Sequence, residues 1–156
     1  MPTLETAAVP TLMLEQSRII RAPRERVYEA WTNPEILKQW FGPTHFVCPN
    51  ASLDVREGGS YSIDVKPLPE ANSPHGLATA AGTYTKVVAN ELLQFTWDPT
   101  WNPGEVSLVT VTFADARGGT QINIRHERFS SEQSRDGHKN GWSGSIEKLA
   151  ALTEQQ

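Results

Sequence analysis

Hydrophobic and polar side chains alternate along most of the chain, and helical spacing appears only near its two ends. Residues 12–21 alternate in this way, and this pattern predicts a first strand. Between residues 46 and 129, short extended runs are separated by Gly, Pro, Asn and Asp, which tolerate turn backbone. Six further strands are expected here, and most joins are short enough to connect antiparallel neighbours. Their approximate ranges are 46–56, 60–66, 77–88, 92–97, 106–115 and 120–128.

Two short helices are expected directly after the first strand. Pro23 suits the first position of a helix, and apolar residues recur three and four positions apart as far as Thr32. A capping Asn33 followed by Pro34 starts the second helix. The apolar faces of the two helices consist of Val27, Ala30 and Trp31, and of Ile36, Leu37 and Trp40.

A longer helix is expected at the C-terminal end. Residues 130–133 read Ser-Ser-Glu-Gln, and Ser130 with Gln133 fits a capping box. Four apolar residues then mark one face of a helix of four to six turns: Trp142, Ile146, Leu149 and Leu152. Glycine costs roughly 1 kcal/mol against alanine inside a helix. Three glycines in this segment therefore indicate a close backbone approach or a bend: Gly137, Gly141 and Gly144.

This order of elements predicts an α+β fold with one sheet and one long covering helix. A length of 156 residues suits a single domain, expected over 12–156 after a flexible tail at 1–11. The mostly antiparallel sheet should hold about six to seven strands and curl, because strands twist. One helix laid across the concave side cannot fill the hollow, so a cavity is expected between them.

Composition narrows the functional classes. The net charge of −4 offers no basic surface for nucleic acid. A single cysteine, Cys48, excludes an intrachain disulfide and favours a cytoplasmic protein. No apolar run approaches the 18 residues of a membrane span, so no membrane insertion is expected. Glycine-rich phosphate-binding motifs are missing too, and no cofactor is expected.

Four stretches of the chain resemble the helix-grip superfamily, which is START-like and polyketide-cyclase-like. Residues 22–34 read Ala-Pro-x-x-x-Val-Tyr-x-Ala-Trp-Thr-x-Pro and continue as Leu-x-x-Trp-Phe-Gly-Pro over 37–43. The other three are Asp-Val-Arg-Glu-Gly-Gly at 54–59, Glu-Leu-Leu-Gln-Phe-Thr-Trp at 91–97, and His-x-x-Gly-Trp-x-x-x-Ile-x-x-Leu at 138–149. The branch resembled is named after the activator of heat-shock-protein-90 ATPase.

The resemblance implies a helix-grip fold, with a curved sheet wrapped on the C-terminal helix and a hydrophobic cavity between them. It covers about residues 12–152. The activity in the branch name is not implied, because that activator has an additional N-terminal domain for which this chain is too short. An aromatic or lipid-like ligand in the cavity is the expectation.

Strand alternation selects the side chains that face this cavity. Successive side chains of a strand point to opposite faces, and on each expected strand one of the two sets is apolar. We take these inward-facing residues, with the tryptophans of the short helices at the mouth, as the predicted ligand contacts. They are Trp31, Trp40, Tyr61, Ile63, Tyr84, Phe95, Trp97, Val111, Phe113, Ile124, His126, Trp142 and Ile146.

His126 is expected on an apolar face of its strand, and its role has three possible interpretations. It is a core histidine bonded to a backbone carbonyl, a ligand contact, or a general acid or base. The other histidines are expected to be less informative: His75 and His138 at the surface, and His45 in a loop. His45 and Cys48 have a spacing seen in metal sites, but zinc needs three or four ligands, so no metal is predicted.

The leading hypothesis for function is an intracellular binding protein for a small hydrophobic or aromatic molecule. An alternative is a cyclase, dehydratase or hydrolase acting on a polyketide-like or aromatic substrate, with His126, Tyr61 or Tyr84 as acid or base. A second alternative is a stress-response or chaperone-interacting module, which would expose a large apolar patch.

Overall fold

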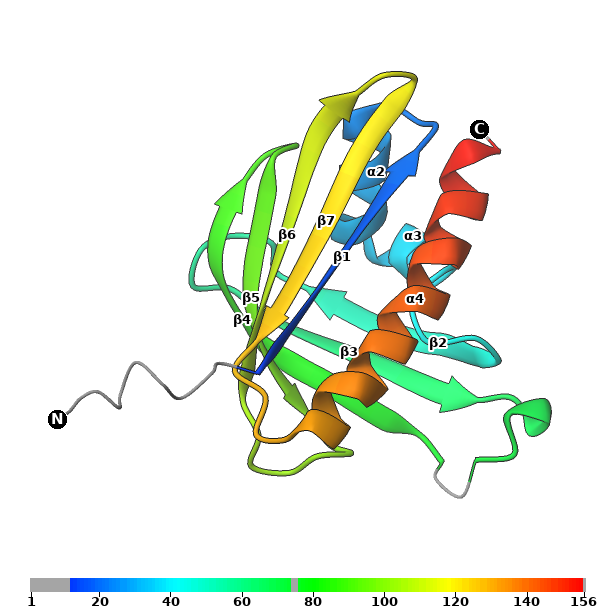
Figure 1. Ribbon diagram of the computed structural model, residues 1–156, viewed down its shortest axis with the longest axis vertical. Coiled ribbons are helices and arrows are strands. Elements are labelled where there is room, and N and C mark those ends of the chain that lie inside the picture. Colours follow the sequence, from blue (N-terminus) through cyan, green and yellow to red (C-terminus); the bar gives the residue numbers. More distant parts are fainter. Residues whose placement is uncertain (1–11, 74–75, 156) are drawn as a thin grey trace, which may run out of the picture.

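A seven-stranded antiparallel sheet and one long helix form most of the protein (Figure 1). The computed structural model describes residues 12–73 and 76–155. The strand order is β1-β7-β6-β5-β4-β3-β2, and every neighbouring pair is antiparallel. The predicted α+β plan is confirmed, whereas the expected tail at 1–11 and His75 lie outside the described residues.

All seven expected strands form, with small differences at their ends. The second strand stops at Leu53, three residues before its predicted end, and the fifth continues two residues further, to Pro99. Irregular pairing within β2 and β4 locally bends these strands, which adds to the curl of the sheet. The strands are β1 (Met13–Ile20), β2 (Phe46–Leu53), β3 (Ser60–Pro67), β4 (Ala78–Val88), β5 (Leu92–Pro99), β6 (Ser107–Ala116) and β7 (Gly119–Glu127).

The two short helices form where the sequence predicts them. Helix α2 spans Arg24–Thr32 after Pro23, and α3 spans Pro34–Leu37. The side chain of Asn33 accepts a hydrogen bond from the backbone of Glu35, as the capping pattern predicted. A single 3-10 turn, η1 (Pro69–Ala71), lies between β3 and β4.

Helix α4 spans Glu132–Glu154, 23 residues, which is just over six turns. Its cap is Ser131, whose hydroxyl accepts a hydrogen bond from the backbone of Ser134. The predicted capping box of Ser130 and Gln133 is therefore wrong: the cap lies one residue later, because Ser130 is bonded to Glu105 instead. No helix among residues 12–73 and 76–155 is both long and apolar enough to cross a bilayer.

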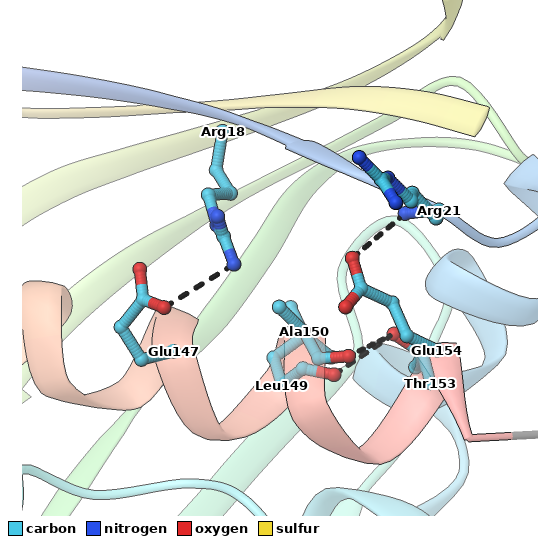
Figure 2. A network of polar contacts seen from close by, with 7 residues as sticks. All are labelled: Arg18, Arg21, Glu147, Leu149, Ala150, Thr153 and Glu154. Carbon is cyan, nitrogen blue, oxygen red and sulfur yellow. Dashed lines mark hydrogen bonds and ion pairs between the residues drawn. The ribbon is translucent and has the colours of Figure 1, made fainter. Parts of the chain in front are cut away.

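Helix α4 runs along the open, concave side of the sheet and is fixed at both sheet edges (Figure 1). At β1, Arg18 pairs with Glu147 at 3.2 Å, and the backbone of Arg21 donates to Glu154 (Figure 2). On the side of β2, Lys148 donates to the carbonyls of Pro43 and Phe46. The helix therefore bridges the two edges and closes the hollow.

Gly144 explains how closely the helix approaches the segment before β2. A Cβ at this position would lie 2.7 Å from the backbone nitrogen of Thr44, a distance that no side chain tolerates. The close backbone approach predicted from the helix glycines is confirmed at this residue.

The inward sets of the strands follow the predicted alternation. On β3, Tyr61, Ile63 and Val65 are buried while Ser62 and Lys66 are exposed. The corresponding sets of β5, β6 and β7 are also buried, and together they form one hydrophobic core with the apolar faces of the helices. Burial of this concave face is the main stabilising contribution of the fold.

Candidate functional site

A pocket of about 580 Å³ lies between the first half of α4 and the end of the sheet formed by β3, β4 and β5. We call it the α4 pocket. Its volume falls in the range of small-molecule sites. Helix α4 contributes one wall, made of Ser134, Gly137, His138, Gly141, Trp142 and Ser145. The opposite side is formed by the segment before β2 and by the strands, through Phe41, Pro43, Phe46, Val65, Ala78 and Trp97.

Aromatic rings form the inner surface of the α4 pocket. The ring centroids of Trp97 and Trp142 are 5.5 Å apart, and Phe41 lies 6.0 to 6.2 Å from both. Trp101, which is 43% exposed, stands at the rim and contacts Trp97 and His138. The pocket therefore offers flat apolar surfaces both at its floor and at its mouth.

The lining of the α4 pocket carries no formal charge. None of the described residues that line it is Asp, Glu, Lys or Arg. Its polar groups are hydroxyls, amides and one imidazole, mostly on the side of Asn102 and Ser134. An ionised ligand would lose its hydration here without meeting a counter-charge.

His138 is buried in the α4 pocket wall, and the expectation that it is exposed is wrong. Its Nδ1–H donates to the carbonyl of Ser134, and its Nε2 accepts from the indole N–H of Trp97 at 3.1 Å. Burial lowers the pKa of His138 and outweighs the opposing effects of the Ser134 carbonyl and the Glu105 charge. The imidazole is therefore neutral at pH 7, and both nitrogens are engaged.

His126 lies beneath the α4 pocket and is fully buried. Its Nδ1 accepts from the indole N–H of Trp142 at 3.0 Å, and its Nε2–H donates to the hydroxyl of Ser107 at 2.7 Å. Burial, with a smaller contribution from His138, lowers the pKa of His126 to about 2. Of the three interpretations, this geometry matches a satisfied core histidine. Its partners are side chains, however, and not the backbone carbonyl that was expected.

The two tyrosines considered as acids or bases also lie away from the α4 pocket lining. Tyr61 and Tyr84 are buried and pack against Phe95, with centroid distances of 5.3 to 6.0 Å. The hydroxyl of Tyr61 donates to the carbonyl of Thr96. Burial raises the pKa of both phenols, so both stay protonated near neutral pH.

Of the thirteen predicted ligand contacts, Trp97 and Trp142 line the α4 pocket. The other eleven are buried in the core and are not among its lining residues. Trp31 and Trp40 were expected at the mouth, but they lie inside: Trp40 is 1% exposed and donates to the carbonyl of Ala30, while Trp31 stacks on Trp142. The short helices thus fill one end of the hollow, and the α4 pocket occupies the other.

Several pocket residues were missed because their signals were weak. Trp101 stands in a Pro- and Gly-containing loop, where alternation gives no facing. Gly137 and Gly141 interrupt the helical pattern in the sequence, but nothing in that pattern indicates a pocket. A Cβ at Gly137 would meet nothing within 4 Å, and one at Gly141 would meet only Pro43 at 3.6 Å. Unlike Gly144, these two glycines are not required by the packing of the chain. Because they have no side chains, the pocket is wider beside them.

The segment of His45 and Cys48 shows no coordination geometry. His45 faces Glu70 at 4.0 Å, while the thiol of Cys48 is buried and donates to the carbonyl of Asn50. Within 12–73 and 76–155, no three His, Cys, Asp or Glu side chains come together as a metal site would need.

Glu105 anchors the start of α4 beside the α4 pocket. Its carboxylate accepts hydrogen bonds from the backbone and hydroxyl of Ser130, from the hydroxyl of Ser134 and from the amide of Asn102. Burial alone would raise the pKa of Glu105, but the hydrogen bonds from Ser130 and Ser134 outweigh it, and the pKa lies below the ordinary value of 4.5.

Replacing this carboxylate should loosen the pocket rim. We expect Glu105→Gln to lower the free energy of unfolding by about 2 kcal/mol, since an amide cannot accept from all four donors. Glu132→Gln, at an exposed acid in the first turn of α4, should cost less than about 1 kcal/mol. Urea denaturation at pH 7 measures both values.

The loss of unfolding free energy caused by Glu105→Gln should disappear in acid. Because the folded pKa lies below the unfolded one, the contribution of Glu105 is complete above about pH 4.5 and is lost as the pH falls through the folded pKa. Equal costs for the two variants at pH 7 would show that Glu105 does not hold the helix.

Comparison with known proteins agrees with this architecture. CV1439 from Chromobacterium violaceum has a TM-score of 0.80 and 27% identity, covering 92% of this chain and 98% of its own. Ms6760 from Mycobacterium smegmatis has a TM-score of 0.75 and 23% identity, covering 91% and 90%. A protein from Aeromonas hydrophila described as AHSA1-like has a TM-score of 0.74 and 20% identity, covering 92% and 93%. No curated protein sequence matches the chain.

A comparison with protein-family models identifies the family as well as the fold. The model described as activator of Hsp90 ATPase homolog 1-like protein matches residues 21–154. This range runs from the start of the short helices to the last turn of α4 and includes both walls of the α4 pocket. The chain therefore belongs to the activator of Hsp90 ATPase homolog 1-like family, within the helix-grip fold.

Proposed function

We propose that the protein binds a small, uncharged apolar or aromatic molecule in the α4 pocket. The observation that carries this proposal is the pocket itself: about 580 Å³, floored by Trp97, Trp142 and Phe41, and without a charged lining residue. Apolar concave surfaces with a few placed polar groups are typical of small-molecule sites.

The ionisable groups near the α4 pocket support binding over catalysis. General acid–base catalysis needs a group that reaches the substrate and titrates near the working pH. His126, Tyr61 and Tyr84 are not among the lining residues. His138 does line the pocket, but its two nitrogens bond Ser134 and Trp97, and burial lowers its pKa.

The test fills the α4 pocket from the helix. Gly137→Leu places a side chain in open space, so the variant should fold and melt at or above the wild-type temperature, since leucine favours helix over glycine by up to about 1 kcal/mol. Calorimetric titration with naphthalene and with 2-naphthol should show binding to the wild type and at least about tenfold weaker binding to the variant.

The matched control adds the same side chain elsewhere on α4. Ala151 is exposed and lies outside the pocket lining, so Ala151→Leu should bind both probes like the wild type. Failure of the wild type to bind either probe, or unchanged binding by a folded Gly137→Leu, would contradict the proposed function.

A further inference from the structure

Ser145 carries a hydroxyl with no hydrogen-bond partner among the described residues. It lies in the wall of the α4 pocket and is 3% exposed, yet it makes no hydrogen bond with any residue of 12–73 or 76–155. Serine and threonine hydroxyls in helices commonly bond the carbonyl four residues earlier, as Thr153 bonds Leu149 in the same helix (Figure 2). The oxygen of Ser145 is not among the fully shielded atoms that lack a partner, so a molecule in the α4 pocket can reach it and form the hydrogen bond that the chain does not supply.

Three other polar side chains that line the α4 pocket differ from Ser145, because they are bonded within the chain. His138 and Ser134 are each bonded within the chain, and Asn102 donates to Glu105 and Ser134. These bonds tie the rim to the start of α4. The side chain of Gln133 also lines the pocket without a hydrogen bond to any described residue, but it is exposed, whereas Ser145 lies in the wall. The hydroxyl of Ser145 is therefore the polar group of the inner wall that the fold leaves available to a ligand.

The face of α4 that leads to Ser145 carries no side chains at two positions. Gly137 and Gly141 precede it on the same face of α4, and neither needs to be glycine for the packing of the described residues. Each glycine weakens the helix, and this cost has no compensation in the chain's own contacts. The space that they leave lies beside the rings of Trp97 and Trp142.

We propose that the α4 pocket selects a flat, uncharged aromatic molecule that carries one hydrogen-bonding group and places this group at Ser145. This inference rests on the proposed function and specifies its ligand class. The ring system lies against Trp97 and Trp142, over the gap left by Gly137 and Gly141. From His138 to Ser145 the helix rises about 10 Å, which accommodates a fused ring system.

Besides the hydroxyl of Ser145, the uncharged lining should make the pocket select neutral ligands over charged ones. A carboxylate entering the pocket would lose its hydration and find no Lys or Arg among the lining residues. A hydroxyl-bearing ring instead gains the partner that Ser145 lacks, while a plain hydrocarbon leaves that hydroxyl unpaired. The predicted order of affinity is thus neutral phenol, then hydrocarbon, then carboxylate.

Calorimetry with three probes of one ring size tests this order: 2-naphthol, naphthalene and 2-naphthoate at pH 7. We expect the wild type to bind 2-naphthol about 3- to 10-fold more tightly than naphthalene, and at least about tenfold more tightly than 2-naphthoate. Ser145→Ala should bring the two neutral probes to within about twofold of each other while leaving naphthalene binding intact. Alanine is a good helix former, so this variant should fold.

Ser62→Ala is the matched control, because Ser62 lies on the exposed face of β3, away from the pocket. It should keep the preference for 2-naphthol. Equal binding of naphthalene and 2-naphthol by the wild type, or a preference that survives Ser145→Ala, would overturn the inference and leave the proposed function standing. Tighter binding of 2-naphthoate than of both neutral probes would overturn the inference and also the uncharged ligand of the proposed function. Binding of none of the three probes would overturn both.

Discussion

Trp142→Ala should lower the free energy of unfolding by about 3 to 5 kcal/mol, the range measured for large aromatic residues removed from cores. Trp142 is 4% exposed. Its ring contacts those of Trp31, Phe41 and Trp97, and its N–H donates to His126. The substitution therefore removes packing on several sides and also leaves the Nδ1 of His126 without a donor.

Two further variants separate these contributions. Trp142→Phe keeps an aromatic ring but loses the hydrogen bond to His126, so it should cost about 1 to 3 kcal/mol. Trp101→Ala removes a tryptophan that is 43% exposed at the rim, and it should cost less than about 1 kcal/mol. Urea denaturation measures all three. A cost for Trp142→Ala as small as that of Trp101→Ala would mean that Trp142 is not part of the core.

The fold was predictable because its signals are local and repeated. Alternation along each strand fixed which side chains face inward, and Asn33 with Pro34 marked a helix start that the structure contains. The shifted cap of α4 shows the limit of such patterns. Ser130, with Gln133 three residues later, is the stronger local signal, yet its hydroxyl bonds Glu105, 25 residues away, and Ser131 caps the helix instead.

The pocket was less predictable, because alternation gives the face of a residue but not its depth. Phe113 and Trp97 both point into the hollow, yet Phe113 packs against Trp31 from α2 whereas Trp97 reaches the α4 pocket. How far the short helices penetrate depends on tertiary packing. His138 was expected at the surface, although it lies four residues before Trp142 and shares its helix face. Trp97 and Ser134 satisfy both imidazole nitrogens in a buried position.

The buried imidazoles also predict a loss of stability in mild acid. His126 has a pKa of about 2 in the folded protein, whereas an unfolded histidine has a pKa of about 6.5. Below pH 6.5 the unfolded chain therefore takes up a proton that the folded chain rejects. The stabilising contribution of the neutral imidazole is complete above pH 6.5 and is lost progressively as the pH falls toward the folded pKa. The lowered pKa of His138 acts in the same direction.

At pH 4.5 this linkage should cost about 2 to 3 kcal/mol for His126 alone, since each pH unit below the unfolded pKa is worth about 1.4 kcal/mol. Urea denaturation between pH 7.5 and 4.5 measures it, and this window lies above the range in which Glu105 becomes protonated. His126→Gln should be less stable at pH 7.5 but should lose about 2 to 3 kcal/mol less across the window.

The control is His45→Gln, at an exposed loop position, which should keep the full decline in the free energy of unfolding. A wild-type stability that stays constant from pH 6.5 to 4.5 would show that His126 can be protonated in the folded state. The network that joins Trp142, His126 and Ser107 would then not be held in its neutral form.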